Sequence, residues 1–486
     1  MFDTLTSMPS KEHNKRLLEN WGKQINAVDK ALKKINESCG GRDPLSKPMT
    51  DYKKIRLAQI LENTKQAIGN AQRRAIMEGT QVPDIGPFKL HAFDMISGLY
   101  PTMISDELVS VQAMPQRLGQ VFFLSYLYGS DRGEVRRGQS MLSPWTGAAD
   151  YNNYAGERID KEVLAENTSA STEGVDLFLS NVPVRAGTLT LITEAGEWSD
   201  NGEGAVKDSS GNVLATVDYR TGKIVFASNS MATMAGGTGA APALIEASYF
   251  QNLEYGPTQA GQVNVRVDCA TLNATPHKLR ALYAFDAGYD LQMSQGVDID
   301  EELLKTCTAE IRHERDGNVI KALYNQAGNT STWNRHIPVG ISQIEHYNSF
   351  FAQLFADSNT IYYETKRSMG NWVVCGKQAI DILNAVGAPR FVGNGLGSQS
   401  GPHFAGVVDG RLKVFFDPFL PDDAYLVGFK GENFYDCGYV IGDYLPIFST
   451  QMVMLDDFVG RRGYCSMYAT KMINNRMYVA GHIVNM

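Results

Sequence analysis

The chain has 486 residues, of which 43% are hydrophobic and 20% are charged. This is the composition of a globular protein long enough for about two to four domains. Its formal net charge of −8 argues against a dedicated DNA-binding protein, because such proteins carry a basic footprint. No run reaches about 18 uncharged apolar residues, so the sequence predicts no membrane span, and it predicts no secretory signal either.

Residues 1–78 are predicted to form a basic helical hairpin. Apolar residues from Leu18 to Ile35 alternate spacings of three and four, as in a coiled-coil seam, and a weaker seam runs from Leu57 to Ala75. The segment carries 15 Lys and Arg against 9 Asp and Glu, a net of +6, whereas the remaining residues carry −14. Two interpretations stay open: a helical domain packed on the rest of the chain, or a separable assembly arm.

After the hairpin, an apolar segment is followed by a polar one. An apolar run, Val121–Tyr128, predicts a buried strand. The polar stretch 130–168 has few aliphatic residues and scattered glycines, and it predicts an exposed loop.

Residues 170–256 are predicted to be an all-β block. Short β-rich runs at this spacing are typical of a small sandwich, and the position of the block after a long loop indicates an insertion. The candidate strands are Val175–Ser180, Leu189–Thr193, Val213–Tyr219, Ile224–Ala227 and Ala243–Tyr249.

A half-buried strand, Val263–Cys269, leads into a stretch that predicts two helices over Leu279–Leu323. The second helix begins at Asp298, which can cap the free N–H groups with Glu301 at the capping-box position. It ends at Gly328, which can take the left-handed cap conformation. A helix of this length, apolar along one stripe and charged in its middle turn, indicates a strut lying across a larger body.

The remainder is mixed at first and then rich in strands. Residues 350–355 and 378–386 are predicted to be helical, and Trp372–Cys375 is predicted to be a buried strand. The later candidate strands are Leu412–Phe416, Tyr425–Phe429, Gly438–Ile441, Tyr464–Thr470 and Met477–Ile483.

No motif in the sequence predicts a catalytic, cofactor or metal site. Gly370–Gln378 differs from a phosphate loop in spacing and lacks its Ser or Thr. The eight histidines do not pair at metal-ligand spacing, the six cysteines form no Cys-x-x-Cys pair, and no Gly-x-Ser-x-Gly elbow occurs. The sequence therefore predicts no enzyme and no cofactor, although an enzyme with a site assembled from distant residues stays an alternative.

Several segments resemble the major capsid proteins of T-even-type tailed bacteriophages, the myophage major head protein family. Gly370–Cys375, for example, is similar to that family's Gly-Asn-Phe-Val-Val-Cys segment, whereas 170–256 departs most from the family's pattern. The resembling segments follow the family's order and are Leu108–Met114, Leu279–Leu323, Gly370–Cys375, Lys413–Phe419, Asp423–Gly431, Tyr435–Tyr439 and Tyr444–Ile447.

The resemblance implies an α+β chain with the tailed-phage major capsid fold, also called Hong Kong 97-like. That fold has a spine helix, a peripheral and an axial domain, and an extended loop, which here would carry the β-sandwich insertion. The implied domains are an N-terminal assembly arm at 1–78, an N-arm with the first strands at 79–134, the extended loop at 135–169, the insertion at 170–256, the peripheral domain with its spine helix at 257–332, the axial domain at 333–448, and a return to the peripheral domain at 449–486.

The resemblance also implies a structural function. Copies would self-assemble into hexameric capsomers of an icosahedral head enclosing phage DNA, and assembly would take place in the host bacterial cytoplasm. The implied partners are other copies, vertex and portal proteins, an internal scaffold, decoration proteins and, without sequence preference, packaged double-stranded DNA. Arg312–Asp316 of the spine helix would face the shell interior or a neighbour. The pentameric vertex protein of the same family stays an alternative.

The family removes its N-terminal segment with a protease that cuts after Glu in a Leu/Ile-x-Glu context. Ile76-Met77-Glu78 fits that context and Gly79 follows, where the helical pattern gives way to an extended segment. The resemblance therefore implies a processing site between Glu78 and Gly79.

Overall fold

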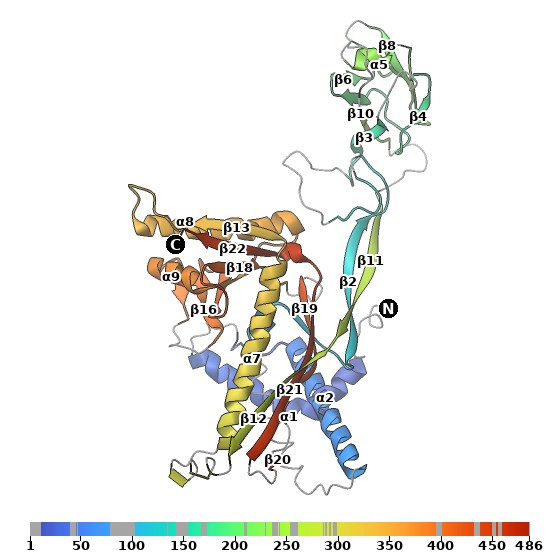
Figure 1. Ribbon diagram of the computed structural model, residues 1–486. Helices are drawn as coiled ribbons and strands as arrows, with labels where there is room; N and C mark the ends of the chain where they lie inside the picture. Colours follow the sequence, from blue (N-terminus) through green and yellow to red (C-terminus); the bar gives the residue numbers. More distant parts are fainter. Residues whose placement is uncertain are drawn as a thin grey trace. The chain divides into compact units, whose positions relative to one another are not determined.

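In the computed structural model, the chain divides into two compact units, residues 1–123 with 269–486 and residues 124–268 (Figure 1). The structure describes residues 11–38, 45, 47–77, 103–133, 135–141, 154–166, 173–208, 211–228, 230–235, 242, 244–252, 261–284, 286, 289–290, 293–294, 299–394, 401–431, 438–449, 453–454 and 459–485.

The first unit begins with the predicted helical hairpin, α1 (Lys11–Ser38) and α2 (Asp51–Met77). Most of the described seam residues are buried, and Trp21 donates a hydrogen bond to Glu62 across the hairpin at 2.9 Å; the buried seam residues are Trp21, Ile25, Val28 and Leu32 of α1 and Leu57 and Leu61 of α2. Their core cluster also contains Ile447 and Tyr464 from a sheet of the same unit. Over the described residues, the hairpin is therefore packed on the rest of its unit.

A five-stranded sheet lies beside this hairpin. Its order is β1 (Ser110–Ala113), β19 (Tyr439–Ser449), β21 (Val459–Met472) and β12 (Thr275–Ala284), with β20 (Val453–Met454) also paired to β21. The long helix α7 (Ile299–Gln326) packs against this sheet, as Figure 1 shows, and confirms the second of the two predicted helices.

The prediction that the first helix begins at Leu279 is wrong for the residues of this stretch that the structure describes up to 284. Residues 275–284 are strand β12, and they pair with β21 without a break from Thr275 opposite Tyr468 to Ala284 opposite Val459. The apolar spacing of this run also suits a strand that has Ala281 buried and its neighbours Arg280 and Leu282 exposed. A ladder with a strand almost two hundred residues away therefore overrides the local helical pattern.

The largest core of the chain surrounds a seven-stranded sheet. Its order is β13 (Asn329–Asn334), β22 (Tyr478–Val484), β18 (Ala424–Gly428), β14 (Trp372–Cys375), β17 (Leu412–Phe416), β16 (His403–Val408) and β15 (Phe391–Gly393). The fully buried β14 lies at its centre, parallel to β17 and antiparallel to β18. The predicted strand at 372–375 is confirmed.

Three helical segments accompany this sheet: α8 (Gln343–Thr365), α9 (Lys377–Val386) and the single 3₁₀ turn η4 (Asn475–Met477). The predicted helices at 350–355 and 378–386 are confirmed. A capping box starts α8, because the Ser342 hydroxyl accepts from the backbone N–H of Glu345, and the Glu345 carboxylate accepts from that of Ser342.

The end of the chain divides between the two sheets. β21 belongs to the five-stranded sheet, whereas β22 pairs in parallel with β13 and antiparallel with β18 in the seven-stranded sheet. Residues 449–486 therefore contribute strands to both sheets.

The second unit contains a β-sandwich. One sheet has the order β3 (Arg158–Glu166), β10 (Leu244–Phe250), β5 (Thr190–Thr193) and β6 (Gly196–Ser199). The other has the order β4 (Asp176–Phe178), β9 (Lys223–Phe226), β8 (Val213–Asp218) and β7 (Ala205–Lys207), and the short helix α5 (Ser230–Met234) adjoins it.

Both sheets contribute to one apolar core, so the predicted sandwich is confirmed, together with all five of its candidate strands. The exposed loop predicted at 130–168 is wrong over 158–166, where β3 pairs with β10. The charged strand β3 is ordered because β10 pairs with its backbone and because Ile159 is buried in the core.

A two-stranded sheet joins β2 (Leu118–Tyr128) to β11 (Val263–Asn273). The backbone N–H of Gly129 donates to Gln262, and that of Ala274 donates to Arg117, so the two strands run antiparallel. The strand predicted at 121–128 exists, but its predicted burial is wrong: among the described side chains of β2, only Val121 and Tyr128 are buried. The mixture of separate helices and mainly antiparallel sheets confirms the α+β class.

Candidate assembly surfaces

The structure brings no catalytic group together in the part of the chain it describes. Among those residues, no set of three His, Cys, Asp or Glu side chains could hold a metal ion. None of the described helices is both long and apolar enough to span a membrane. The predicted processing site, Glu78 and Gly79, lies outside the described residues. The features of the chain that bear on function are therefore its surfaces and the contacts between its parts.

The ribbon face is the first such surface. It consists of Tyr126, Val263, Val265 and Val267, which lie in the second unit. The pairing of Gly129 with Gln262 places Tyr126 opposite Val265, and alternate residues of a strand share one side. The three valines are 50%, 57% and 48% exposed. Because two strands alone are marginally stable in water, this apolar face indicates a contact that the single chain does not supply.

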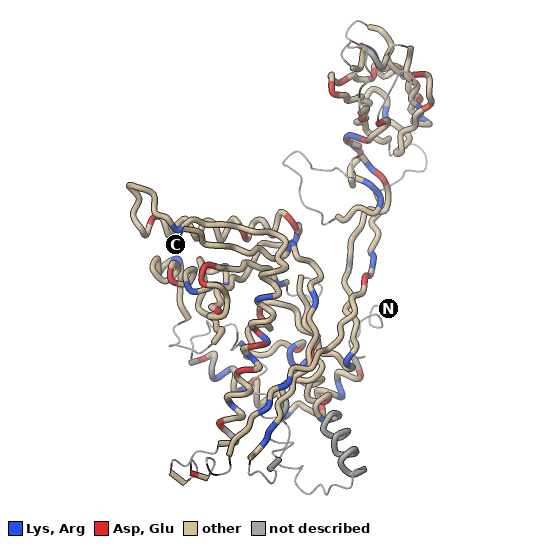
Figure 2. The backbone as a smooth tube through the Cα atoms, in the orientation of Figure 1, with Lys and Arg blue, Asp and Glu red and all other residues tan. Residues whose placement is uncertain are grey.

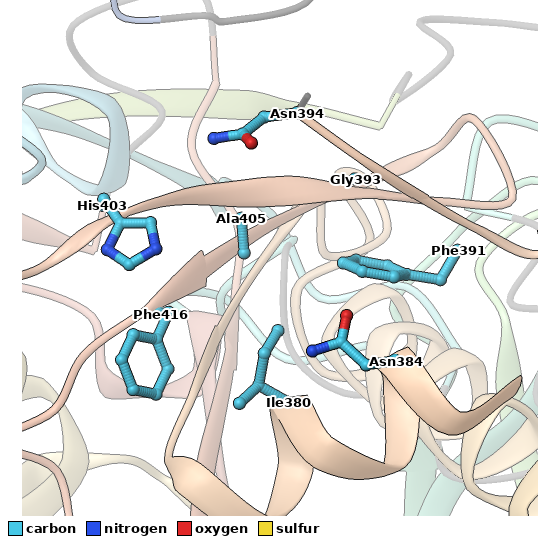
Figure 3. Close-up of a pocket in the computed structure, with 8 residues that line it drawn as sticks. All are labelled: Ile380, Asn384, Phe391, Gly393, Asn394, His403, Ala405 and Phe416. Atoms are coloured by element: carbon cyan, nitrogen blue, oxygen red, sulfur yellow. The ribbon is translucent and has the colours of Figure 1, made fainter. Parts of the chain in front are cut away.

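A pocket of about 400 Å³ lies at one edge of the seven-stranded sheet (Figure 3). Phe391 of β15, Phe416 of β17 and Ile380 of α9 supply its apolar part. Three polar residues line it as well: Asn384, Asn394 and His403. The Asn394 amide donates to a backbone carbonyl of β16, and the Nδ1 atom of His403 lies 2.9 Å from the carbonyl oxygen of Gly401, so local contacts hold both side chains.

An exposed apolar turn lies at the start of α8. Its residues Val339, Ile341 and Ile344 are all exposed, and Val339 is fully so. The backbone N–H of Ile341 donates to the carbonyl of Pro338 at 3.3 Å, which closes the turn. Gly340 has φ of +93°, a backbone conformation that suits glycine.

The acidic pair, Asp106 and Glu107 of α4 (Ser105–Leu108), connects α2 to the seven-stranded sheet. Arg56 of α2 forms a buried ion pair with Asp106. Lys53 of α2 and Lys413 of β17 lie 2.8 Å and 3.1 Å from the two carboxylate oxygens of Glu107. A cavity of about 630 Å³ adjoins these residues. The acidic pair therefore holds the N-terminal hairpin on the body electrostatically.

The pKa of Glu107 depends on this arrangement. Burial by itself would raise it, but the nearby charges of Lys53, Lys430 and Lys413 outweigh burial and lower it to about 2. A carboxylate whose pKa is lower in the folded than in the unfolded state stabilises the fold at pH values above its unfolded-state pKa. This stabilisation is lost as the pH falls through the folded-state pKa.

We expect Glu107→Gln to lower the free energy of unfolding by about 3 kcal/mol near pH 7, at 1.36 kcal/mol per pKa unit. The difference from the wild type should shrink as pH falls from about 4.5 towards 2, because the wild-type carboxylate then becomes protonated. Urea unfolding across this pH range measures it, with the exposed Glu302→Gln as control. A difference that is independent of pH would contradict the assigned role of the charge.

The middle turn of α7 is more buried than the sequence predicted. Arg312–Asp316 was expected to face outward, but Arg315 and Asp316 are each only 2% exposed. The Arg315 guanidinium lies 2.8 Å from Asp443 and over the Tyr468 ring. Asp316, whose pKa is raised by burial, accepts backbone hydrogen bonds from Ile104 and Ser105 at the start of α4. Partners on β19, on β21 and before α4 compensate these charges, so Arg315 is not available to DNA.

Four of these features were not predicted from the sequence. The signal for the apolar turn is Gly340 in Pro338-Val339-Gly340, because a turn with positive φ at its third position favours Gly there. The alternation at Val263–Val267 indicated a strand, but not which face stays in solvent. The pocket and the basic partners of the acidic pair have no local signal, because they come from segments far apart in the sequence.

Comparison with known proteins adds independent findings. The family described as "Major capsid protein Gp23" matches residues 85–485. The major capsid protein of Vibrio phage KVP40 is 23% identical over 398 residues, which cover 75% of this chain and 72% of that protein. That of Enterobacteria phage T4 is 24% identical over 391 residues, covering 75% and 71% respectively.

Among solved structures, the chain is similar to the jumbo bacteriophage PhiKZ capsid, with a TM-score of 0.37 and 9% identity over 77% of this chain and 91% of that chain. It is also similar to the capsid of Myoviridae phage XM1, with a TM-score of 0.33 and 9% identity over 48% and 81% respectively.

Proposed function

Because the chain belongs to the Gp23 family of major capsid proteins, we propose that its copies assemble into hexameric capsomers of an icosahedral phage head that encloses double-stranded DNA. The chain is a structural component of the virion capsid, and its family is not a class of enzymes. The observation that supports assembly through this chain's own surfaces is the ribbon face, whose three valines are about half exposed on an isolated pair of strands.

Electron microscopy of the purified full-length protein tests this function. We expect rings, tubes or closed shells, and Val265→Asp should reduce their number because it places a charge in the proposed contact. A wild-type protein that stays monomeric at every concentration and salt condition would contradict the proposal.

The two sheets of the first unit support an assignment of two domains. We propose that α7 is the spine of a peripheral domain built on the five-stranded sheet, and that the seven-stranded sheet is the core of an axial domain. The axial domain then includes β22, whereas β19 belongs to the peripheral sheet. The sandwich would be an insertion carried by the extended loop, and it would begin with β3 instead of at residue 170.

The distribution of charge supports two further partners. Lysines 23, 30, 33 and 34 are exposed on α1, so the N-terminal hairpin offers a basic surface to an internal scaffold during assembly in the host cytoplasm. Lys278 and Arg280 are exposed on β12, where Figure 2 shows basic residues along β12 and β21. Such residues would contact packaged DNA through phosphate charge alone. Vertex, portal and decoration proteins are the other proposed partners.

We expect processing between Glu78 and Gly79 to remove the N-terminal hairpin from mature particles. Residue 78 follows the last residue of α2, and the cut would take the chain from a net charge of −8 to −14. The cut would also take Arg56 and Lys53 away from the acidic pair, so the body must rearrange there. The intact mass of the shell protein from mature particles measures it. A mass near the full 53.5 kDa would exclude processing at this site.

A further inference from the structure

The apolar turn and the pocket lie at opposite edges of one sheet. The turn follows β13, which is one edge strand of the seven-stranded sheet. The pocket is lined by β15, the other edge strand, by its neighbour β16, by β17 beyond it and by helix α9. A protein that carries complementary features at opposite ends can bind copies of itself head to tail, and such contacts close into a ring when the rotation between copies allows it.

The turn is preorganised to present an aliphatic side chain. The hydrogen bond between Pro338 and Ile341 and the positive φ of Gly340 fix the backbone on both sides of Val339. A fully exposed valine contributes nothing to the core of its own chain. Because the turn is already ordered, little conformational entropy is lost when Val339 is buried in a partner.

The pocket suits such a side chain. In Figure 3, Phe391, Phe416 and Ile380 surround an open space on one side, and Asn384, Asn394 and His403 border it. Its volume of about 400 Å³ has room for Val339 and part of the turn backbone. The polar border can satisfy the backbone groups of an inserted turn, as buried polar groups require.

The charges beside the two features are complementary. Arg335 precedes the turn, and Asp381 lies on α9 next to Asn384, one helical turn away. Neither side chain forms an ion pair with any described residue. An unpaired positive charge beside the turn and an unpaired negative charge beside the pocket favour an approach in which one copy offers its turn to the pocket of the next.

We propose that Val339 of one copy inserts into the Phe391–Phe416 pocket of the next copy around a capsomer, with Arg335 facing Asp381 across the contact. This inference rests on the proposed function, because it identifies the contact by which copies form rings. The contact is heterologous: each copy donates its turn to one neighbour and accepts the turn of the other.

A disulfide test in assembled particles examines the geometry. Full-length Val339→Cys/Asn384→Cys should form covalent ladders of linked chains on mild oxidation, visible on a nonreducing gel. Each single variant, which keeps the six native cysteines, should form none. The matched control is Val339→Cys/Arg411→Cys, since Arg411 is exposed but does not line the pocket. Particles that form without a ladder, or a bond within one chain, would overturn the proposal.

A charge exchange tests the same contact without cysteines. Arg335→Asp and Asp381→Arg should each reduce ring formation about tenfold, and the double variant should restore it. Val339→Asp should reduce ring formation at least as much. If wild-type rings form and all these variants assemble normally, this contact is wrong while the proposed function stands. If the wild type forms no rings at all, the proposed function itself fails.

Discussion

Replacing residues 130–261 with an Asn-Gly turn is expected to leave a folded, soluble protomer that no longer builds shells. The backbone N–H of Gly129 donates to the carbonyl of Gln262 at 2.7 Å, so the ends of β2 and β11 are already paired, and a two-residue turn can join them. The sandwich has its own core cluster, and the cores around the five- and seven-stranded sheets contain none of its residues. Its removal should therefore leave both of those cores intact.

The measurements are circular dichroism and thermal melting of the protomer, with electron microscopy of assembly. The boundaries matter: a deletion of only 170–250 would remove β10 and leave β3 without its partner, so it would measure misfolding instead of assembly. The full-length Val265→Asp variant is the control for the ribbon face alone. An unfolded protomer, or shells as abundant as those of the wild type, would show that the sandwich is not an assembly insertion.

Leu323→Ala in α7 is expected to lower the free energy of unfolding by about 2–5 kcal/mol, the range for removing a leucine side chain from a packed core. Leu323 is fully buried and lies in the same cluster as Val319 and Ile320 of the helix and Phe350 and Tyr478 of the seven-stranded sheet region. Leu304, at the other end of the helix, is only partly buried, so Leu304→Ala should cost less.

Urea unfolding of the protomer with 130–261 replaced is the appropriate measurement, because it avoids a separate transition from the second unit. The exposed Lys321→Ala lies two residues before Leu323 and is the matched control, with an expected change within about 0.5 kcal/mol. An equal loss from Leu304→Ala and Leu323→Ala would mean that the helix is not anchored by its carboxyl-terminal half.

The sequence by itself determined the features that have a local signal. The extents of α7 and α9, a central part of α8, the buried strand β14 and the strands of the sandwich follow from periodicity, capping residues and turn residues. The order of family-like segments identified the capsid family, which the match over 85–485 confirms. Local signals suffice here because periodicity, capping residues and turn residues lie within each element or at its ends.

Only the tertiary structure decided which faces are buried and which residues meet. Thr275 and Tyr468 are 193 positions apart, yet their pairing makes β12 a strand. Arg315 and Asp316 looked like an exposed charged turn, and they are buried because Asp443 and the backbone before α4 compensate them. The pocket likewise depends on α9 and three strands meeting at one sheet edge. The free energy of burying a side chain depends on the groups that surround it in space, and one stretch of sequence does not contain them.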